Sequence, residues 1–411
     1  MAAPTRAEPP RRLLSFEFVG LCLVAFLAVC NVTVFYNLFG YLAAIGVPAG
    51  LRGVLVGTAA LTAMVLYLVA SPFLGVRRAP AAMLVGIAVL AASGLSYLAV
   101  HAPLGLLALR VLNGVGHFLM GAGATALLVT AIPPERSGQA FGIYSVAILL
   151  AYGLVPTVMD ALVPHLPGPA HGYAVATLSL VPALAIVLAI RRRLPALERG
   201  GAADGRLPWP ELRGNLAAPP VALLLLLNTL YFANWSGLFF LFKGFALEKG
   251  VGNVGTFFAV LTGLMIAIRL LAGRLFDRMD KVLLMIASFL TIAAAHLALA
   301  AASARFVPLV GALFGLGLGA GYPAINGLMF DFSPPRLRPL NANLMLFAVQ
   351  GGSFLGPSLG GALVARRGPR GYAAASVALA LAAAAVSALL ARLRPAERSA
   401  SAAARRKEEP A

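Results

Sequence analysis

Charged side chains are scarce in this sequence. Only 11% of its 411 residues are Asp, Glu, Lys or Arg, whereas 60% are hydrophobic, and the mean hydropathy is +0.90. Soluble globular proteins are about 25% charged and about 45–50% apolar. The composition therefore excludes an ordinary soluble enzyme and indicates an integral membrane protein.

Cysteine is almost absent as well. Cys22 and Cys30 both lie in the first apolar segment. In a helix they are about 12 Å apart along the axis, which is beyond disulfide reach. Neither a disulfide framework nor a metal site follows, and no residue pattern calls for a cofactor. Because the apolar run continues past Cys30 to about Tyr41, we interpret it as a retained membrane span rather than a removed signal peptide.

Motifs for nucleotides and nucleic acids are also missing. The formal charge is +18, but no exposed domain gathers the basic residues, so a nucleic-acid partner is excluded. No G-x-x-x-x-G-K motif occurs, and the run from Gly315 to Gly321, with glycine at every second position, lies inside an apolar segment. This run therefore favours close helix packing, and ATP-driven transport by this chain alone is excluded.

Long apolar runs, separated by short polar or Pro- and Gly-rich breaks, predict twelve membrane helices. The predicted spans are 16–40, 51–74, 80–100, 103–131, 138–162, 172–190, 220–243, 251–272, 281–301, 305–332, 340–364 and 371–391. The long connection 191–219 divides them into six and six. We expect an all-α integral membrane fold of two bundles, 16–190 and 220–391, with a central loop 191–219 and tails 1–15 and 392–411.

Basic residues are distributed unevenly between the two sides of the predicted membrane. Of the 32 Lys and Arg, 23 lie on the side of both termini and the central loop, 7 lie on the opposite side, and Arg110 and Arg269 lie within spans. Cytoplasmic loops carry an excess of basic residues. We therefore expect a multi-pass protein of a bacterial plasma membrane, with both termini in the cytoplasm.

The two halves share small motifs at a constant offset of 201 residues. The matching positions are Gly114 and Gly315, Gly116 and Gly317, Pro133-Pro134 and Pro334-Pro335, and Pro156 and Pro357. A constant offset indicates an internal duplication. Parallel six-helix repeats place a substrate site between the halves, near the middle of the bilayer.

Three motifs resemble those of the major facilitator superfamily. They are Gly273-Arg274-Leu275-Phe276-Asp277-Arg278 with the basic Lys281 after it, Arg110-Val111-Leu112-Asn113-Gly114, and Gly356-Pro357-Ser358-Leu359-Gly360-Gly361. The resemblance covers about residues 12–392 and implies two pseudo-symmetric six-helix bundles and secondary transport. The sequence departs from the pattern at Ser71 and Gly75, which replace the glycine and aspartate of the first-half motif.

The resemblance assigns a conformational latch to the loop of Gly273, Asp277 and Arg278. In the family this loop joins the halves on the cytoplasmic side, and its partner here would lie near residues 136–138. The alternative is a solvated loop charge that only favours one orientation in the membrane.

Few ionisable groups lie inside the predicted spans. Arg110 must face protein or water because a charge at this depth is costly, and we expect Asp160 as its partner, with backbone carbonyls as the alternative. The resemblance links this arginine to proton movement. His117 titrates near physiological pH and either binds substrate, relays protons or packs against a neighbouring helix. We assign proton coupling to Arg110, Asp160 and His117, whereas Arg269 and His296 are expected to be structural.

Further polar and aromatic residues are predicted to line a central substrate cavity, as the corresponding spans do in the family. With His117, they are Asn31, Tyr36, Asn37, Tyr152, Tyr231, Asn234, Trp235, Tyr322, Asn326 and Gln350. Hydrogen bonds between helices are the alternative role of each amide. No acidic residue lies deep in this set, so we expect a neutral, amphipathic or anionic substrate.

These observations favour a secondary transporter that works by alternating access. We expect proton-coupled export of a metabolite or drug-like compound, by a monomer in the lipid bilayer. An uptake permease and a transporter-like sensor or scaffold are the alternatives. A membrane enzyme is disfavoured because no His cluster, paired carboxylates or activated nucleophile occurs in the spans.

Overall fold

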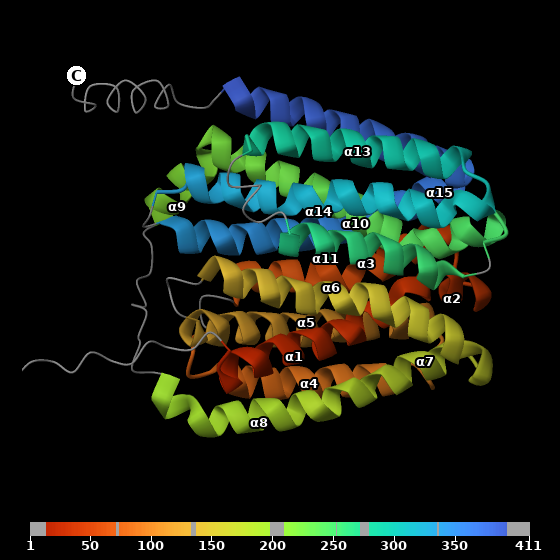
Figure 1. Cartoon of the computed structure of the whole chain (residues 1–411). Coiled ribbons are helices and arrows are strands. Elements are labelled where there is room, and N and C mark those ends of the chain that lie inside the picture. The colour runs from red at the N-terminus through yellow and green to blue at the C-terminus, as the bar shows by residue number, and fades with distance from the viewer. Residues whose placement is uncertain are drawn as a thin grey trace, which may run out of the picture.

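The computed structural model describes residues 14–70, 74–132, 137–197, 209–251, 253–271, 279–334 and 337–392. Within these ranges every regular element is a helix, and the long helices lie side by side along one direction (Figure 1). Apolar helices of this kind satisfy their own backbone hydrogen bonds, which is the requirement for crossing lipid.

The first half holds eight α-helices among the described residues. They are α1 Phe16–Thr33, α2 Leu38–Ala44, α3 Ala49–Val69, α4 Ala79–Ser96, α5 Pro103–Ala131, α6 Ser137–Leu162, α7 Pro169–Ala176 and α8 Leu180–Leu197. The described part of the second half contains α9 Trp209–Ala217, α10 Pro219–Glu248, α11 Val254–Leu271, α13 Lys281–Ala301, α14 Val307–Phe332 and α15 Arg338–Arg392.

The helices account for the twelve predicted spans. In the described ranges ten helices are long and apolar enough to cross a membrane, and Val254–Leu270 is a further, shorter apolar helix. α15 consists of two helices joined at Gly368, whose φ of 67° favours glycine and interrupts the helix. When α15 is divided there, each predicted span has its helix, and the all-α fold is confirmed.

Helix extends into the range that we assigned to the central loop. α8 continues to Leu197, and α9 covers Trp209–Ala217. Arg191–Arg193 follow the apolar part of α8, and arginine is a good helix former in water. Loss of apolar periodicity at this point therefore marks the end of the apolar segment rather than the end of the helix.

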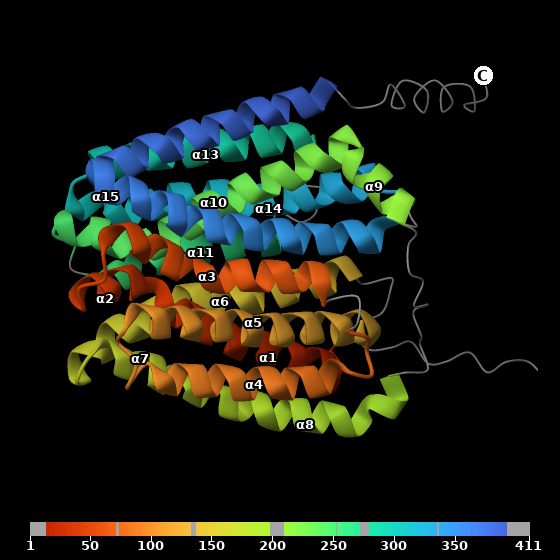
Figure 2. The same cartoon turned by 180° about the vertical axis from the view of Figure 1, so that it is seen from behind.

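Both ends of the described chain lie at the same end of the bundle. α1 begins and α15 ends at the side of α9, here called the terminus end (Figure 1). The opposite side, here called the far end, holds α2 and α7 (Figures 1 and 2). In both views α4 and α8 lie at one edge of the bundle and α13 and α15 at the other, so the two halves meet in the middle.

Paired glycines show the pseudo-symmetry of the two halves. A Cβ at Gly114 would lie 2.4 Å from the carbonyl oxygen of Ala59 on α3, and a Cβ at Gly315 would lie 2.6 Å from that of Leu261 on α11. The two glycines therefore permit the same close approach between the second and fourth span of each half. The internal repeat is thus visible in packing as well as in sequence.

The halves approach each other most closely through two helix pairs, α3 with α15 and α6 with α11. A Cβ at Gly53 of α3 would lie 2.2 Å from the carbonyl oxygen of Pro357 on α15, so no larger residue fits there. Gly53 lies in the second turn of α3, close to the far end. The G-P-x-x-G-G motif of α15 therefore forms part of the contact between the halves.

Candidate functional site

A cavity lies between the two halves. It is lined by α1, α3, α4, α5 and α6 from the first half and by α10 and α15 from the second. Its lining includes six of the residues predicted from the sequence, namely Asn31, Arg110, His117, Tyr152, Trp235 and Gln350. The sequence missed other lining residues, among them Phe35, Asn113, Phe232, Ser236, Phe239 and Ser353.

The size of the cavity suits a small organic molecule. Its volume is about 120 Å³. The value of 120 Å³ counts only the space open to the centres of water molecules, and one water needs about 10–15 Å³ of it, so the cavity has room for about ten waters. As liquid, ten waters fill about 300 Å³. This filled volume lies at the lower end of the range for small-molecule pockets.

Among the described residues of the lining, Arg110 on α5 is the one residue of the types Lys, Arg, Asp and Glu. Its side chain does not pair with Asp160, so this predicted ion pair is wrong. Instead Nε and Nη2 donate to the backbone carbonyls of Leu55 (3.2 Å) and Val56 (2.8 Å) on α3, the alternative that we considered. α3 and α5 approach closely through Gly114, so these carbonyls come within reach, whereas Asp160 lies in the last turn of α6 at the far end.

Arg110 also belongs to a buried polar network between α4 and α5. Its Nη1 donates to the Asn113 Oδ1 atom at 3.2 Å, and the Tyr97 hydroxyl donates to the same oxygen at 3.1 Å. Asn113 in turn donates to Ser93 Oγ at 2.7 Å. The network fixes the arginine in place. The sequence indicates this network through the spacing of three residues between Arg110 and Asn113, which puts both side chains on one helix face.

His117 and Asn31 complete the polar part of the lining. His117 follows Arg110 by two helical turns and faces the same cavity. Asn31 on α1 donates to Ser179 Oγ at 2.6 Å and to the Leu27 carbonyl at 3.2 Å. The asparagine therefore links two segments and borders the cavity, and its role in binding a substrate stays a prediction.

Aromatic rings form a wall that crosses from one half to the other. The ring of Tyr152 on α6 packs edge-on against Trp235 and Phe239 of α10, with centroids 5.2 and 5.0 Å apart. Trp235 and Phe239 are stacked on each other at 5.9 Å. A wall of this kind offers a large apolar surface to a ligand and changes its shape when the halves move.

Several predicted binding residues lie outside the lining of this cavity. They are Tyr36, Asn37, Tyr231, Asn234, Tyr322 and Asn326. Three of them bond to helix backbone instead: the Tyr231 hydroxyl donates to the Leu318 carbonyl, Asn234 to Leu230, and Asn326 to Tyr322. Inside a membrane, a polar side chain without a partner is costly, and a nearby carbonyl is the closest acceptor.

Arg269 and His296, which we expected to be structural, both contact aromatic rings. Arg269 places its guanidinium 5.4 Å from the ring centroid of Tyr322. His296 is fully buried, and its ring packs against Phe314 at 4.8 Å and Tyr372 at 6.0 Å.

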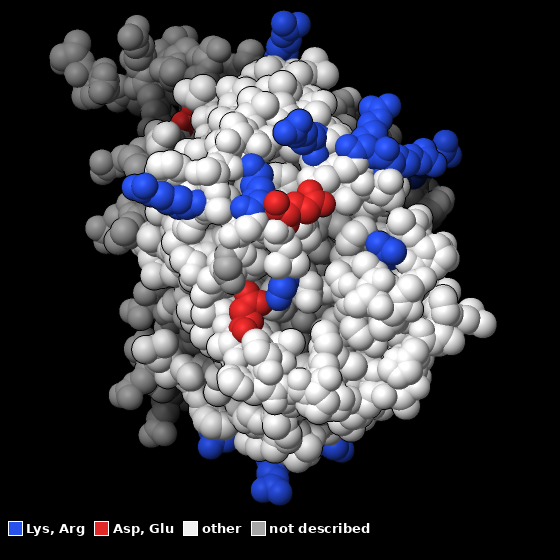
Figure 3. All heavy atoms as spheres, turned by 90° about the vertical axis from the view of Figure 1, so that its right-hand side faces the viewer, with Lys and Arg blue, Asp and Glu red and all other residues white. Residues whose placement is uncertain are grey.

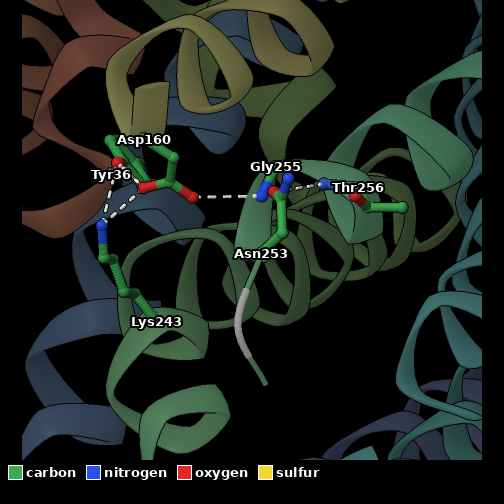
Figure 4. A network of polar contacts seen from close by, with 6 residues as sticks. All are labelled: Tyr36, Asp160, Lys243, Asn253, Gly255 and Thr256. Carbon is green, nitrogen blue, oxygen red and sulfur yellow. Dashed lines mark hydrogen bonds and ion pairs between the residues drawn. The ribbon is translucent and has the colours of Figure 1, made fainter. Parts of the chain in front are cut away.

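A second polar cluster joins the two halves at the far end (Figure 4). Asp160 on α6 forms a 2.6 Å ion pair with Lys243 on α10. The hydroxyl of Tyr36, from the turn Val34–Asn37 after α1, donates to the same carboxylate oxygen, and Lys243 donates to that hydroxyl at 3.0 Å. We call Tyr36, Asp160 and Lys243 the far-end triad. The sequence did not indicate Lys243, because it is the last residue of the predicted seventh span, 220–243, and was counted only as a basic residue of the side opposite the termini.

The other oxygen of Asp160 reaches a second helix of the second half. It accepts a hydrogen bond of 3.2 Å from the backbone N–H of Gly255, in the first turn of α11 (Figure 4). Helix N-termini attract carboxylates. A Cβ at Gly255 would lie 2.6 Å from Cα of Thr157 on α6, so glycine is required for this approach.

The far-end triad is partly open to solvent. The side chains of Lys243 and Asp160 retain 18% and 17% exposure. Figure 3 shows this end of the molecule, where the acidic side chains near the middle lie against basic ones. Solvent therefore has access to a carboxylate that holds the two halves together.

The residues of the predicted latch, Gly273, Asp277 and Arg278, lie outside the described residues. At the terminus end, Lys281 at the start of α13 forms a 2.7 Å ion pair with Asp331 on α14. Both partners belong to the second half, so this pair does not join the halves.

Comparisons with known proteins identify the family of this chain and show its fold in solved structures. The sequence model described as Major Facilitator Superfamily matches residues 21–307 and 278–411. The structure resembles that of a peptide transporter, POT, solved with sulfate, with a TM-score of 0.71 at 12% identity, covering 94% of this chain and 96% of that one. It also resembles the human organic anion transporter MFSD10, with a TM-score of 0.66 at 17% identity, covering 93% of this chain and all of the other. A search of curated protein sequences found no significant match. At these identities the structural likeness concerns the fold.

Proposed function

We propose that this chain, which belongs to the Major Facilitator Superfamily, moves a small organic molecule across a membrane by alternating access. Membership of this family makes the protein a membrane transporter rather than an enzyme. The observation that carries the proposal is the cavity itself, because its lining comes from both halves and must change when they rock against each other.

The far-end triad supports the proposed movement. It joins the first half, through Tyr36 and Asp160, to Lys243 of the second half. Together with the contact of Gly53 and Pro357, it holds the halves together at the far end. In our proposal, breaking the triad opens the cavity to that side, which the distribution of basic residues assigns to the outside of the cell.

A proton is the proposed coupling ion. Protonation of Asp160 removes the negative charge that attracts the Lys243 ammonium, so the link between the halves weakens. Solvent reaches the carboxylate, since 17% of the side chain is exposed. For an inward proton gradient to drive export, the proton that Asp160 takes up from the outside must leave to the cytoplasm through the cavity after the cargo has been released and the far end has closed. Arg110 and His117, on the cavity-facing side of α5, remain the proposed partners of this step within the cavity.

The cargo that we propose is neutral, amphipathic or anionic. The described residues that line the cavity include no aspartate or glutamate, whereas Arg110 and several aromatic rings are present. A strongly cationic compound would therefore lack a counter-charge in this cavity. We place the protein in a bacterial plasma membrane as a monomer surrounded by lipid.

A liposome assay tests the proposal. Full-length protein is reconstituted, a proton gradient is imposed, and compounds of a pooled metabolite extract that cross the membrane are identified by mass spectrometry. We expect gradient-dependent movement out of the compartment that corresponds to the cytoplasm. Movement in the opposite direction would indicate an uptake permease, and no movement of any compound would indicate a sensor or scaffold.

A further inference from the structure

We propose that the cargo is a small aromatic anion whose carboxylate binds the guanidinium of Arg110. The inference rests on the proposed transport function and narrows its substrate class. It follows from three features of the cavity: a buried charge without a carboxylate partner, unused N–H groups on that charge, and an aromatic wall shared by both halves.

The charge of Arg110 is not balanced within the described residues. Only 5% of this residue is exposed. Lys243 and Lys281 differ in this respect, because they form ion pairs with Asp160 and Asp331. Arg110 instead bonds to backbone carbonyls and to the neutral amide of Asn113. A cation at this depth is costly unless an anion accompanies it, and the cavity leaves space for one.

The guanidinium retains donors for such an anion. An arginine carries five N–H groups, and the three hydrogen bonds of Arg110 to described residues use three of them. Nη1 and Nη2 each keep one N–H. A carboxylate binds a guanidinium through two parallel hydrogen bonds, and these charge-assisted bonds are about twice as strong as neutral ones.

The position of the guanidinium is already fixed before a ligand arrives. Its Cζ atom lies 4.8 Å from the ring centroid of Phe35, so the ring covers one face of the group. The carbonyls of α3 and the amide of Asn113 hold its edges. Binding therefore requires little loss of side-chain entropy, which favours a specific site over a general positive potential.

The remaining lining favours an aromatic group on the anion. Tyr152, Trp235 and Phe239 border the same cavity as Arg110. Aromatic pairs contribute about 0.5–1.5 kcal/mol beyond the burial of their area. A flat ring attached to a carboxylate would thus contact the wall and the guanidinium together, whereas an aliphatic dianion would leave one charge in an apolar environment.

A binding experiment with matched probes tests the inference. Trp235 borders the cavity and serves as a fluorescent reporter in full-length Trp209→Phe protein, since the chain has 2 tryptophans. The probes are 4-phenylbutyrate, its neutral amide 4-phenylbutyramide and the cation 4-phenylbutylamine. We expect the carboxylate to bind about 30-fold more tightly than the amide, and the amine to bind least.

Two variants separate the charge of Arg110 from its structural role. Arg110→Gln removes the charge, and Asn113→Asp keeps the arginine but supplies a carboxylate next to it. Each is expected to reduce the preference for carboxylate over amide to about 3-fold or less, while binding of the amide stays within about 2-fold. Gly263→Ala on α11, where an added Cβ meets nothing within 4 Å, is the matched control and should behave as wild type.

The outcomes distinguish this inference from the proposed function. Equal binding of carboxylate and amide to wild type, or an unchanged preference in Asn113→Asp, overturns the anion site. If the liposome assay shows transport of a neutral compound that does not require Arg110, the anion site is overturned and the transport function stands. If phenylbutyrate binds through Arg110 but no compound moves, transport fails and the site stands.

Discussion

Arg110 and Lys243 are two basic side chains within the helical bundle, and their surroundings differ. Lys243 forms an ion pair with Asp160, and the pair joins one half of the protein to the other. Arg110 has carbonyl and amide partners, all of which lie within the first half. The lysine retains 18% side-chain exposure, whereas only 5% of the arginine is exposed.

The difference indicates two separate tasks. An ion pair that crosses the interface between the halves must break when they separate, so we propose that Lys243 and Asp160 control conformation. A charge that is held within one half keeps its partners during the movement. Arg110 is therefore suited to hold a ligand in both conformations. The following predictions test this division, from the largest expected effect to the smallest.

Removing the charge of Arg110 should affect transport most. In Arg110→Gln, we expect exchange of labelled phenylbutyrate across liposomes to fall about 100-fold, because a charge-assisted pair is lost. Arg110→Lys keeps a positive charge but cannot form two parallel hydrogen bonds to a carboxylate, so we expect the exchange rate to fall about 10-fold. If wild type, Arg110→Gln and Arg110→Lys exchange phenylbutyrate at equal rates, Arg110 does not bind the ligand and is not distinguished from Lys243 in this way.

Neutralising Asp160 should open the far end. In Asp160→Asn we expect a reporter cysteine at Ser353, in a Cys22→Ala and Cys30→Ala background, to react about 10-fold faster with an impermeant maleimide added at that side. A 10-fold change corresponds to about 1–2 kcal/mol for this partly exposed ion pair, which is less than the loss of a buried pair would cost.

The control for this variant is a charge exchange. Asp160→Lys combined with Lys243→Asp restores opposite charges across the same interface and should return the labelling rate toward that of the starting protein. If Asp160→Asn labels at the original rate, the far-end triad does not hold the halves together.

Enlarging Gly255 should have a moderate effect on the same contact. An added methyl would meet Cα of Thr157 at 2.6 Å. Overpacking at the low end of about 1 kcal/mol would raise labelling at the reporter cysteine about 5-fold in Gly255→Ala. Gly263→Ala on the same helix has open space around it and should stay within about 2-fold. If both variants are labelled at similar rates, the close contact of α6 with α11 at Gly255 is not what keeps the far end closed.

The smallest effect is expected from His117. Replacement by Gln keeps a hydrogen-bonding group but removes the imidazole as a possible carrier of protons. We expect the rate of transport to fall by about 2- to 3-fold, with a pH profile that differs from that of the wild-type protein. A pH profile that matches wild type would assign the proton step to Asp160 and leave His117 as a packing or binding residue.

Much of the fold could be predicted from the sequence. The spans follow from the length of the apolar runs, and the repeat follows from the 201-residue offset of glycines such as Gly114 and Gly315. Both are local properties of the chain. The extension of α8 to Leu197 was missed, since hydropathy marks where apolar character ends and does not mark where a helix ends.

The candidate site could be predicted only in part. Asn31, Trp235 and Gln350 border the cavity as expected, but Tyr231 and Asn326 do not, although they lie at similar depth. Depth in the membrane follows from position along the sequence. Which face of the helix points to the cavity depends on the rotation of each helix against its neighbours, and twelve apolar helices have too small an amphipathic difference to reveal it.

The sequence by itself determined that this is a twelve-span membrane protein with few internal charges, because burial in lipid acts on each segment separately. Only the tertiary structure decided how those charges are partnered. It pairs Asp160 with Lys243, 83 residues away, and leaves Arg110 beside the cavity with carbonyl partners. The physical reason is that an ion pair forms between the groups that packing brings within about 4 Å, and that packing involves the whole bundle.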